Sequence, residues 1–147
     1  SQFNMYALKS KGIKINTFED IRNYSVGTLR DDAVENILMF KTGMKLSDFQ
    51  RVSLNLNNTK KLADGRVDLV PMTFTTLSFT CHEAGLNIDD FEPVFILDKK
   101  GMYFAFNLET PDPVILELQK AFDDLKEEGE LVAIFSKYDQ KISELNP

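Results

Sequence analysis

The feature that most constrains the fold of this chain is a regular alternation of predicted strands and helices that are joined by short loops. Strands are expected where apolar residues alternate or cluster between turn-forming residues, at 3–8, 24–29, 49–56, 67–72, 91–97 and 102–108. Helices are expected at 16–23, 31–41, 60–64, 73–84, 111–129 and 131–138. Alternation of this kind predicts an α/β fold, in which an open, mostly parallel sheet is flanked by helices.

Capping residues mark several of the predicted helix starts. Asn16 or Thr17 is expected to cap the first short helix, and the run Asn57-Asn58-Thr59 is expected to cap the helix at 60–64. The long C-terminal helix is expected to start at Pro111. It carries an apolar stripe at helical spacing, formed by Val114, Ile115, Leu118, Phe122 and Leu125.

The charge balance limits the partners that this chain can bind. Its 147 residues contain 17 Lys and Arg against 23 Asp and Glu, which gives a net charge of −6. Nucleic acids and anionic membranes both bind basic surfaces, so the sequence argues against either partner. The chain is long enough to bury the core of one domain, and no apolar run reaches the ~18–20 residues that a membrane helix needs.

The first residues, Ser-Gln-Phe-Asn-Met-Tyr, lack the basic and apolar regions of a signal peptide. If the natural product is exported, its targeting segment is therefore expected to have been removed. The strand predicted at 3–8 also starts without a preceding turn. We therefore expect the chain to be an internal fragment of a longer protein.

Few residues are candidates for catalysis or metal binding. Cys81 and His82 are the single cysteine and the single histidine, and neighbours on a helix point about 100° apart, so they cannot act as nucleophile and base. They also lack the further ligands of a zinc site, and we expect a buried thiol and a partly exposed imidazole. The acidic pairs at 89–90 and 123–124 do not follow the pattern of a calcium loop. No catalytic residue and no metal site is therefore predicted.

A third acidic pair differs because it lies where a predicted strand passes into a helix. In open α/β sheets, ligands bind outside the carboxyl ends of the strands, where helix N-termini present free N–H groups. The candidate ligand-binding residues at this junction are Thr28, Leu29, Arg30, Asp31 and Asp32, with Arg30 as the cation. The alternative is that Asp31 only caps its own helix. Neither a phosphate-binding loop nor a dinucleotide fingerprint accompanies the junction, so no cofactor is predicted.

Thr73 follows the strand predicted at 67–72 and is a candidate at the same edge of the sheet. Its hydroxyl either caps the next helix or donates to a ligand, and the sequence leaves both roles open. We expect the two strand ends to converge, which favours a ligand site at this edge.

Three segments of the chain resemble a known family. They read YSVGTLRDDA at 24–33, LADGRVDLV at 62–70 and MYFAFN at 102–107, the last followed by Thr-Pro-Asp and a long helix. Together they are similar to the bacterial extracellular solute-binding proteins of ABC importers, specifically the type II, polar-amino-acid-binding family 3. The resemblance covers residues 13–138.

The resemblance implies a periplasmic binding protein-like type II lobe with a C-terminal helical tail from the other lobe. Residues 1–8 would be a hinge strand, 9–97 the second lobe and 98–108 the returning hinge strand. Residues 109–147 would be helices that pack on the first lobe, whose first part is missing from the chain. The apolar stripe of this tail would then lack its partner. We therefore expect the chain to self-associate or to fold the tail back on its own lobe.

The resemblance also implies a function. In such proteins the turn after the first strand of this lobe contacts the ligand, which corresponds to residues 28–32. An acid usually follows the strand at 67–72, but residues 71–80 contain none, which argues against an α-amino acid ligand. The resemblance implies an exported, periplasmic component of an ABC transporter that captures a small polar solute, amino-acid-like or an organic anion, between two lobes. Such a protein is no enzyme, needs no cofactor and docks on a membrane permease.

Two other classes of function stay open at this point. The first is a ligand-sensing domain of a signalling protein with the same fold, in which closure would drive a partner domain. The second is an enzyme built on this fold. The lack of any nucleophile–base pair or metal-ligand set in the sequence argues against the enzyme.

Overall fold

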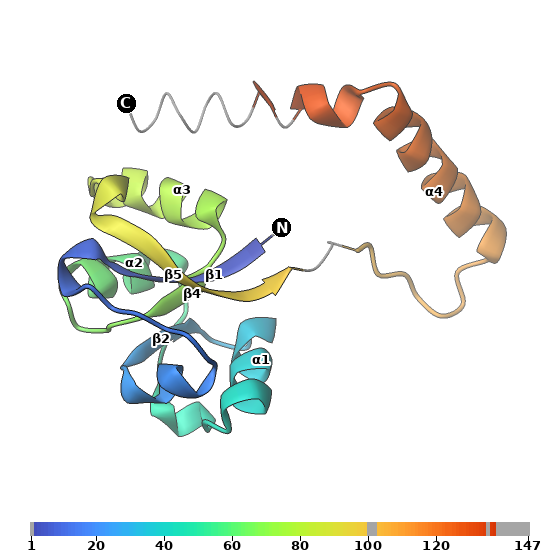
Figure 1. Cartoon of the computed structure of the whole chain (residues 1–147). Coiled ribbons are helices and arrows are strands. Elements are labelled where there is room, and N and C mark those ends of the chain that lie inside the picture. Colours follow the sequence, from blue (N-terminus) through green and yellow to red (C-terminus); the bar gives the residue numbers. More distant parts are fainter. Residues whose placement is uncertain (1, 100–102, 135, 138–147) are drawn as a thin grey trace. The chain divides into compact units, whose positions relative to one another are not determined.

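The computed structural model describes residues 2–99, 103–134, 136 and 137 (Figure 1). The chain divides into two compact units, one that extends to about residue 101 and another that starts at about residue 102. Each unit is described by itself.

The described part of the first unit contains five strands, β1 (Gln2–Leu8), β2 (Val26–Leu29), β3 (Phe49–Val52), β4 (Val70–Met72) and β5 (Phe91–Lys99). β1 lies between β4 and β5 and runs antiparallel to both, whereas β2 and β3 pair in parallel. A parallel bridge between Val26 and Leu69 connects β2 to the segment just before β4. Every strand except β1 therefore runs in one direction, and the α/β fold is confirmed. The pairs that β1 forms are antiparallel, so the strands do not form the single, mostly parallel sheet that was predicted.

The connections between the strands explain why β1 runs the other way. β3, β4 and β5 are each reached through an α-helix, and such a crossover returns the chain to the same edge of the sheet. β1 is instead followed by loops and two 3-10 helices, η1 (Lys9–Lys11) and η2 (Glu19–Asn23). The chain therefore enters β2 in the opposite direction.

Helices cover both faces of the strands. They are α1 (Ala33–Thr42), α2 (Asn55–Ala63) and α3 (Phe74–Ala84), with short 3-10 helices at η3 (Leu46–Asp48) and η4 (Ile88–Asp90). α1 lies on one side of the strands, and α2 and α3 lie on the other (Figure 1).

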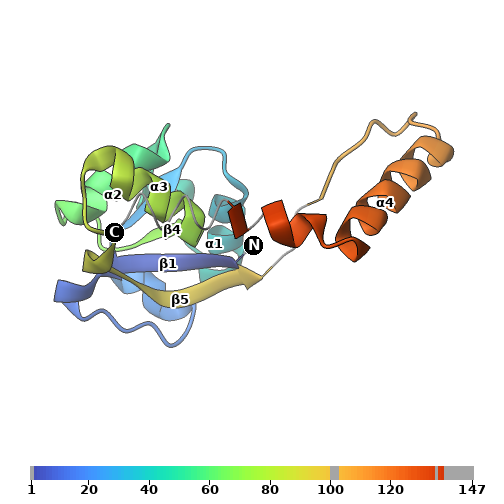
Figure 2. The same ribbon diagram turned by 90° about the horizontal axis from the view of Figure 1, so that it is seen from above.

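The alternation of side chains along β1 produces two hydrophobic cores. Met5 and Ala7 lie in the core beneath α1, whereas Tyr6 between them lies in the core beneath α2 and α3. β1 and β5 run side by side for most of their length, as Figure 2 shows. The first unit therefore has the two-sided core that an open α/β sheet requires.

The start of α2 differs from the sequence-based expectation. α2 begins at Asn55, within a segment predicted to be a strand, and the strand before it ends at Val52. Asn58 and Thr59 are buried within α2 rather than capping it. Thr59 is accommodated there because its hydroxyl shares a 2.7 Å hydrogen bond with Thr80 Oγ1 of α3.

The caps predicted for the first short helix are also wrong. Neither Asn16 nor Thr17 caps η2 through its side chain. Instead, the Asp20 carboxylate accepts both of their backbone N–H groups, each at 2.9 Å. An acid in the first turn of a helix can accept hydrogen bonds from backbone amides that precede the helix. Asp20 inside η2 is therefore the acceptor, and the residues before η2 are the donors.

The second unit contains α4 (Asp112–Glu127), and residues 130–134 after it are also helical. α4 follows Pro111 as predicted, and none of its residues is buried. The exposed fraction of its stripe lies between 43% and 51% at Val114, Leu118, Phe122 and Leu125. None of the described helices is both long enough and apolar enough to span a bilayer.

Residues 103–108 do not form the strand that the sequence predicts. A strand needs a neighbouring strand with which to hydrogen-bond, and the described residues of the second unit contain none. Met102 and Tyr138, which begin the predicted strand and end the last predicted helix, lie outside the described residues.

Candidate functional site

The carboxyl ends of the parallel strands lie at one edge of the first unit, and all the predicted site residues lie at this edge. Thr28 and Leu29 end β2, and residues 30–32 form the turn from β2 to α1, called here the β2–α1 turn. Thr73 joins β4 to α3. Because the Val26–Leu69 bridge makes the chain before β4 a neighbour of β2, the two predicted strand ends lie on adjacent strands. An edge of this kind is where open α/β sheets bind ligands.

The two acids of the β2–α1 turn have different roles. Asp32, not Asp31, caps α1, because its Oδ1 accepts the Val34 backbone N–H at 2.9 Å. Asp31 instead has a backbone φ of 60°, the left-handed conformation that residues other than glycine seldom adopt. Its side chain is 92% exposed and forms an ion pair with Arg51 at 3.0 Å. The alternative that Asp31 is a plain cap is therefore wrong.

The turn is held by two residues that sequence reasoning missed, Glu35 of α1 and Arg51 of β3. Arg51 donates from Nε to Glu35 Oε1 at 2.7 Å and from Nη2 to Glu35 Oε2 at 2.8 Å. Glu35 also accepts the Thr28 hydroxyl at 2.7 Å and the Asp31 backbone N–H at 3.1 Å. Only 3% of the Glu35 side chain is exposed. Thr28 is buried too, so its hydroxyl stabilises the turn through Glu35 and is not exposed to solvent.

These contacts determine the charge of the buried Glu35 carboxyl. The hydrogen bond from Arg51 lowers the pKa of Glu35, and this effect, with the bonds from Thr28 and Asp31, outweighs the opposing effect of burial. The same contact with Glu35 raises the pKa of Arg51. Glu35 therefore remains an ionised structural anion at neutral pH. It is unsuited to be a general acid, which needs a raised pKa.

Arg30 and Thr73 present polar groups at the same edge. The Arg30 backbone N–H donates to Val52 O at 2.9 Å, and its exposed side chain has no ion-pair partner among the described residues. Thr73 Oγ1 accepts the Thr76 backbone N–H at 3.2 Å and shares a 2.9 Å hydrogen bond with Thr76 Oγ1. The capping role of Thr73 is therefore confirmed, and a ligand role stays a prediction.

Two large apolar side chains are exposed where α2 and α3 begin. Leu54 immediately precedes α2 and is 61% exposed, and Phe74 is the first residue of α3 and is 56% exposed. Both follow strands whose carboxyl ends form the candidate edge. The edge therefore combines exposed charge from Arg30 and Asp31 with exposed apolar surface.

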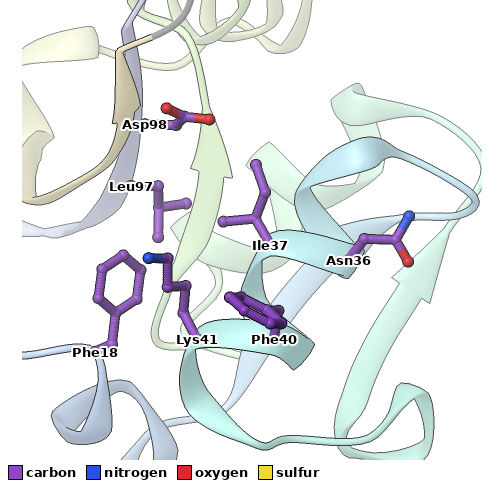
Figure 3. Close-up of a pocket in the computed structure, with 7 residues that line it drawn as sticks. All are labelled: Phe18, Asn36, Ile37, Phe40, Lys41, Leu97 and Asp98. Atoms are coloured by element: carbon purple, nitrogen blue, oxygen red, sulfur yellow. The ribbon is translucent and has the colours of Figure 1, made fainter.

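A groove of about 540 Å³ lies elsewhere, between α1 and the end of β5 (Figure 3). Its lining comprises Phe18, Asn36, Ile37, Phe40, Lys41, Leu97 and Asp98. The Lys41 ammonium lies 5.7 Å from the centroid of the Phe18 ring and 5.8 Å from that of Phe40, so its charge is directed at the groove's own aromatic rings. No predicted site residue lines this groove.

The remaining candidates are structural. Cys81 is buried and His82 is exposed, as predicted, and burial with the nearby Asp90 charge raises the pKa of the Cys81 thiol to about 11. Asp68, the acid of the second resembling segment, forms a 2.6 Å ion pair with Lys11 before β4 begins, at the opposite end of the strands. Within the described residues, no cluster of three or more metal-ligating side chains occurs.

Comparison with known proteins identifies a family for most of the chain. The family model described as NMT1/THI5 like matches residues 1–101. It differs from the polar-amino-acid-binding family that the sequence indicated. No curated protein sequence matches the chain.

Several solved structures share the fold. A histidine kinase sensor domain with similarity to periplasmic binding proteins is 17% identical with a TM-score of 0.72, covering 92% of this chain and 57% of its own. A mutant of ArgBP from T. maritima is 14% identical with a TM-score of 0.73, and the match covers 95% of this chain and 58% of that one. An amino acid ABC transporter substrate-binding protein from Streptococcus pneumoniae, bound to L-arginine, is 17% identical with a TM-score of 0.69, covering 99% and 59%.

These likenesses establish a periplasmic binding protein-like fold. The chain spans less than two thirds of the length of each of the three structures. The fold that the resemblance implied therefore agrees with the comparisons.

Proposed function

We propose that this chain, which belongs to the NMT1/THI5-like family, forms one lobe of a two-lobed receptor that captures a small polar solute. The solute, amino-acid-like or an organic anion, would bind between the lobes at the edge formed by residues 28–32 and Thr73. The observation that carries this proposal is the β2–α1 turn. Hydrogen bonds hold its Asp31 in the left-handed conformation at a strand end, beside an exposed Arg30 that forms no ion pair with the described residues.

The proposed receptor binds its solute without catalysing a reaction. Closure of two lobes over a solute excludes water, and exclusion of water strengthens each polar contact with the bound solute. The similar structures include a substrate-binding protein of an amino acid ABC transporter and a sensor domain of a histidine kinase. We therefore propose a binding protein that needs no cofactor and performs no reaction.

We further propose that the receptor serves an ABC importer, is exported to the periplasm and delivers its solute to a membrane permease. One of the similar structures is the substrate-binding protein of such a transporter. The second candidate function is ligand sensing, because another is the sensor domain of a histidine kinase. The neighbouring genes distinguish the two: a permease and an ATPase favour transport, whereas a kinase or cyclase domain on the same chain favours sensing.

Native mass spectrometry of the full-length gene product tests the proposed function. A freshly purified receptor should retain one small polar molecule, whose mass disappears after mild unfolding and dialysis. A product that retains no solute and binds none from a library of amino acids and organic anions would contradict the proposal.

Substitution of Arg30 tests the proposed site. Arg30→Ala should weaken binding of the retained solute by about tenfold or more, because a hydrogen bond to a charged group contributes about 1.5–3 kcal/mol. Stability should hardly change, since Arg30 forms no ion pair with the described residues. Arg66→Ala is the matched control, because Arg66 is exposed but precedes β4 at the other end of the strands. Equal affinities of Arg30→Ala and Arg66→Ala by calorimetry would exclude this edge.

Thr73 needs a more careful variant because it also caps α3. Thr73→Ala should lower the free energy of unfolding by about 1 kcal/mol through the lost cap alone. Thr73→Asn keeps a capping oxygen but changes the group offered to a solute. Weaker solute binding by Thr73→Asn at unchanged stability would therefore report a ligand contact.

A further inference from the structure

The backbone of Asp31 is the unusual feature of the candidate edge. Within the described residues, Asp31 is the one residue other than glycine with a positive φ, at 60°. This conformation is disfavoured for a residue with a Cβ, and it persists only where surrounding contacts hold it. The contacts that hold it should therefore control how the turn presents its side chains.

The contacts that hold Asp31 come from two residues that bind each other, Glu35 and Arg51. The buried Glu35 carboxylate accepts the Asp31 backbone N–H, and the Arg51 guanidinium binds both oxygens of Glu35. The same guanidinium also binds the Asp31 carboxylate at 3.0 Å. Asp31 is therefore held twice, through its backbone by Glu35 and through its side chain by Arg51.

The geometry of this cluster suits a positioning role. A guanidinium binds two oxygens of one carboxylate in a fixed plane and still has a donor for a second carboxylate, which an ammonium cannot do in the same geometry. Arg51 comes from β3, Glu35 from α1 and Thr28 from β2, so three elements meet at the turn. The turn is therefore shaped before any solute arrives.

We propose that Arg51 and Glu35 are positioning residues that fix the β2–α1 turn in the conformation that presents Arg30 and Asp31 to the solute. This inference rests on the proposed function of the edge. Neither Arg51 nor Glu35 needs to touch the solute, because both act through the backbone and the side chain of Asp31.

Amide hydrogen exchange on this chain tests the positioning role, with Arg51→Lys as the variant. Lysine keeps a positive charge beside the buried Glu35, so the chain should still fold, but it cannot bind Glu35 and Asp31 in the planar geometry. The amides of Arg30, Asp31 and Asp32 should exchange about tenfold faster, as expected when charged hydrogen bonds are lost. Exchange in α3 should not change.

Lys11→Ala is the control, because it removes another ion pair of the first unit, with Asp68, at the other end of the strands. It should leave exchange in the β2–α1 turn unchanged. A second variant, Asp31→Gly combined with Arg51→Lys, should slow this exchange again, because glycine adopts a φ of 60° without strain. Unchanged exchange in Arg51→Lys, equal acceleration by Lys11→Ala, or no recovery with Asp31→Gly would each overturn the positioning role.

Solute retention separates this inference from the proposed function. In the full-length gene product, native mass spectrometry should detect less retained solute in Arg51→Lys than in Lys11→Ala. If the turn amides of Arg51→Lys exchange faster but the variant retains as much solute as Lys11→Ala, Arg51 does not contribute to solute binding. The proposed function would then still stand. A wild-type product that retains nothing would refute the proposed function, and the exchange result on the solute-free chain would still decide whether Arg51 and Glu35 fix the turn.

Discussion

Protonation of Asp68 should remove a defined part of the stability of the first unit. Its carboxylate accepts hydrogen bonds from the Lys11 ammonium at 2.6 Å, the Ser25 hydroxyl at 2.6 Å and the Ser25 backbone N–H at 3.0 Å. These contacts join η1, the start of β2 and the segment before β4. Burial raises the pKa of this carboxyl, but the hydrogen bonds from Lys11 and Ser25 outweigh burial and lower the pKa to about 2.

The size and the direction of the effect follow from this pKa. The ordinary value is 3.8, so the ionised carboxylate is favoured by folding. At 1.36 kcal/mol for each pKa unit, the stabilisation is about 2 kcal/mol. The Asp68 side chain is 29% exposed, and solvent screening makes this value an upper bound. The contribution is fully present above pH 3.8 and is lost as the pH falls through about 2.

Urea unfolding of Asp68→Asn and the wild type measures this contribution. The free energies of unfolding should differ by up to about 2 kcal/mol at about pH 6, and the difference should shrink towards zero near pH 2. Asp64→Asn is the matched control, since Asp64 pairs with Arg66 at 3.5 Å and both side chains are more than half exposed. The control should change stability by less than about 0.5 kcal/mol. A difference between wild type and Asp68→Asn that stays constant over this pH range would refute the reasoning.

Two further predictions concern the interior of the first unit. Gly27→Ala should lower the free energy of unfolding by about 1–3 kcal/mol, because the added Cβ would lie 2.8 Å from Asn58 Oδ1. In thermal unfolding, the double variant with Asn58→Ala should lose less stability than the two single variants lose in total. Cys81, whose pKa burial raises to about 11, should react with a thiol reagent near neutral pH only after unfolding, and rapid labelling of the folded chain would contradict its buried position.

The order of the elements could be predicted from the sequence because it depends on local periodicity. The apolar residues of β1 and β5 cluster in short runs, and α1, α3 and α4 are bounded by residues that start or end helices. The start of α2 could not be predicted in this way. Asn58 and Thr59 are typical of helix caps, and their burial depends on the packing of α2 against α3, which joins Thr59 to Thr80.

The strand predicted at 103–108 illustrates a second limit. Its apolar and aromatic residues favour a strand, and the structure leaves Tyr103, Phe104 and Leu108 largely exposed without one. Strand propensity describes how well a residue fits a pleated surface, and that surface must be supplied by a neighbouring strand. A local pattern cannot show whether such a neighbour exists.

At the candidate site, the sequence predicted the edge but not the contacts that shape it. A strand passing into a helix beside paired acids indicated residues 28–32, and the hydroxyl at Thr73 indicated the cap of α3. Glu35 and Arg51 gave no signal, because a glutamate in a first helical turn and an arginine in an alternating strand both usually face solvent. Their pairing joins residues that lie 16 positions apart in the chain, so only the tertiary fold reveals it.

The Lys11–Asp68 and Arg51–Glu35 ion pairs have different consequences because they lie at opposite ends of the parallel strands. Lys11 and Asp68 join segments at the amino ends. There, among the residues that the structure describes, only glycines have a positive φ, so we infer that this pair mainly stabilises the fold. Arg51 and Glu35 lie at the carboxyl ends, where the same kind of contact holds Asp31 at a φ of 60° and leaves Arg30 exposed. A disfavoured conformation lowers stability, so a fold that needed stability alone would gain by placing glycine at position 31. Unlike glycine, the aspartate at this position supplies a carboxylate, which binds Arg51 at 3.0 Å at the edge where such sheets bind ligands.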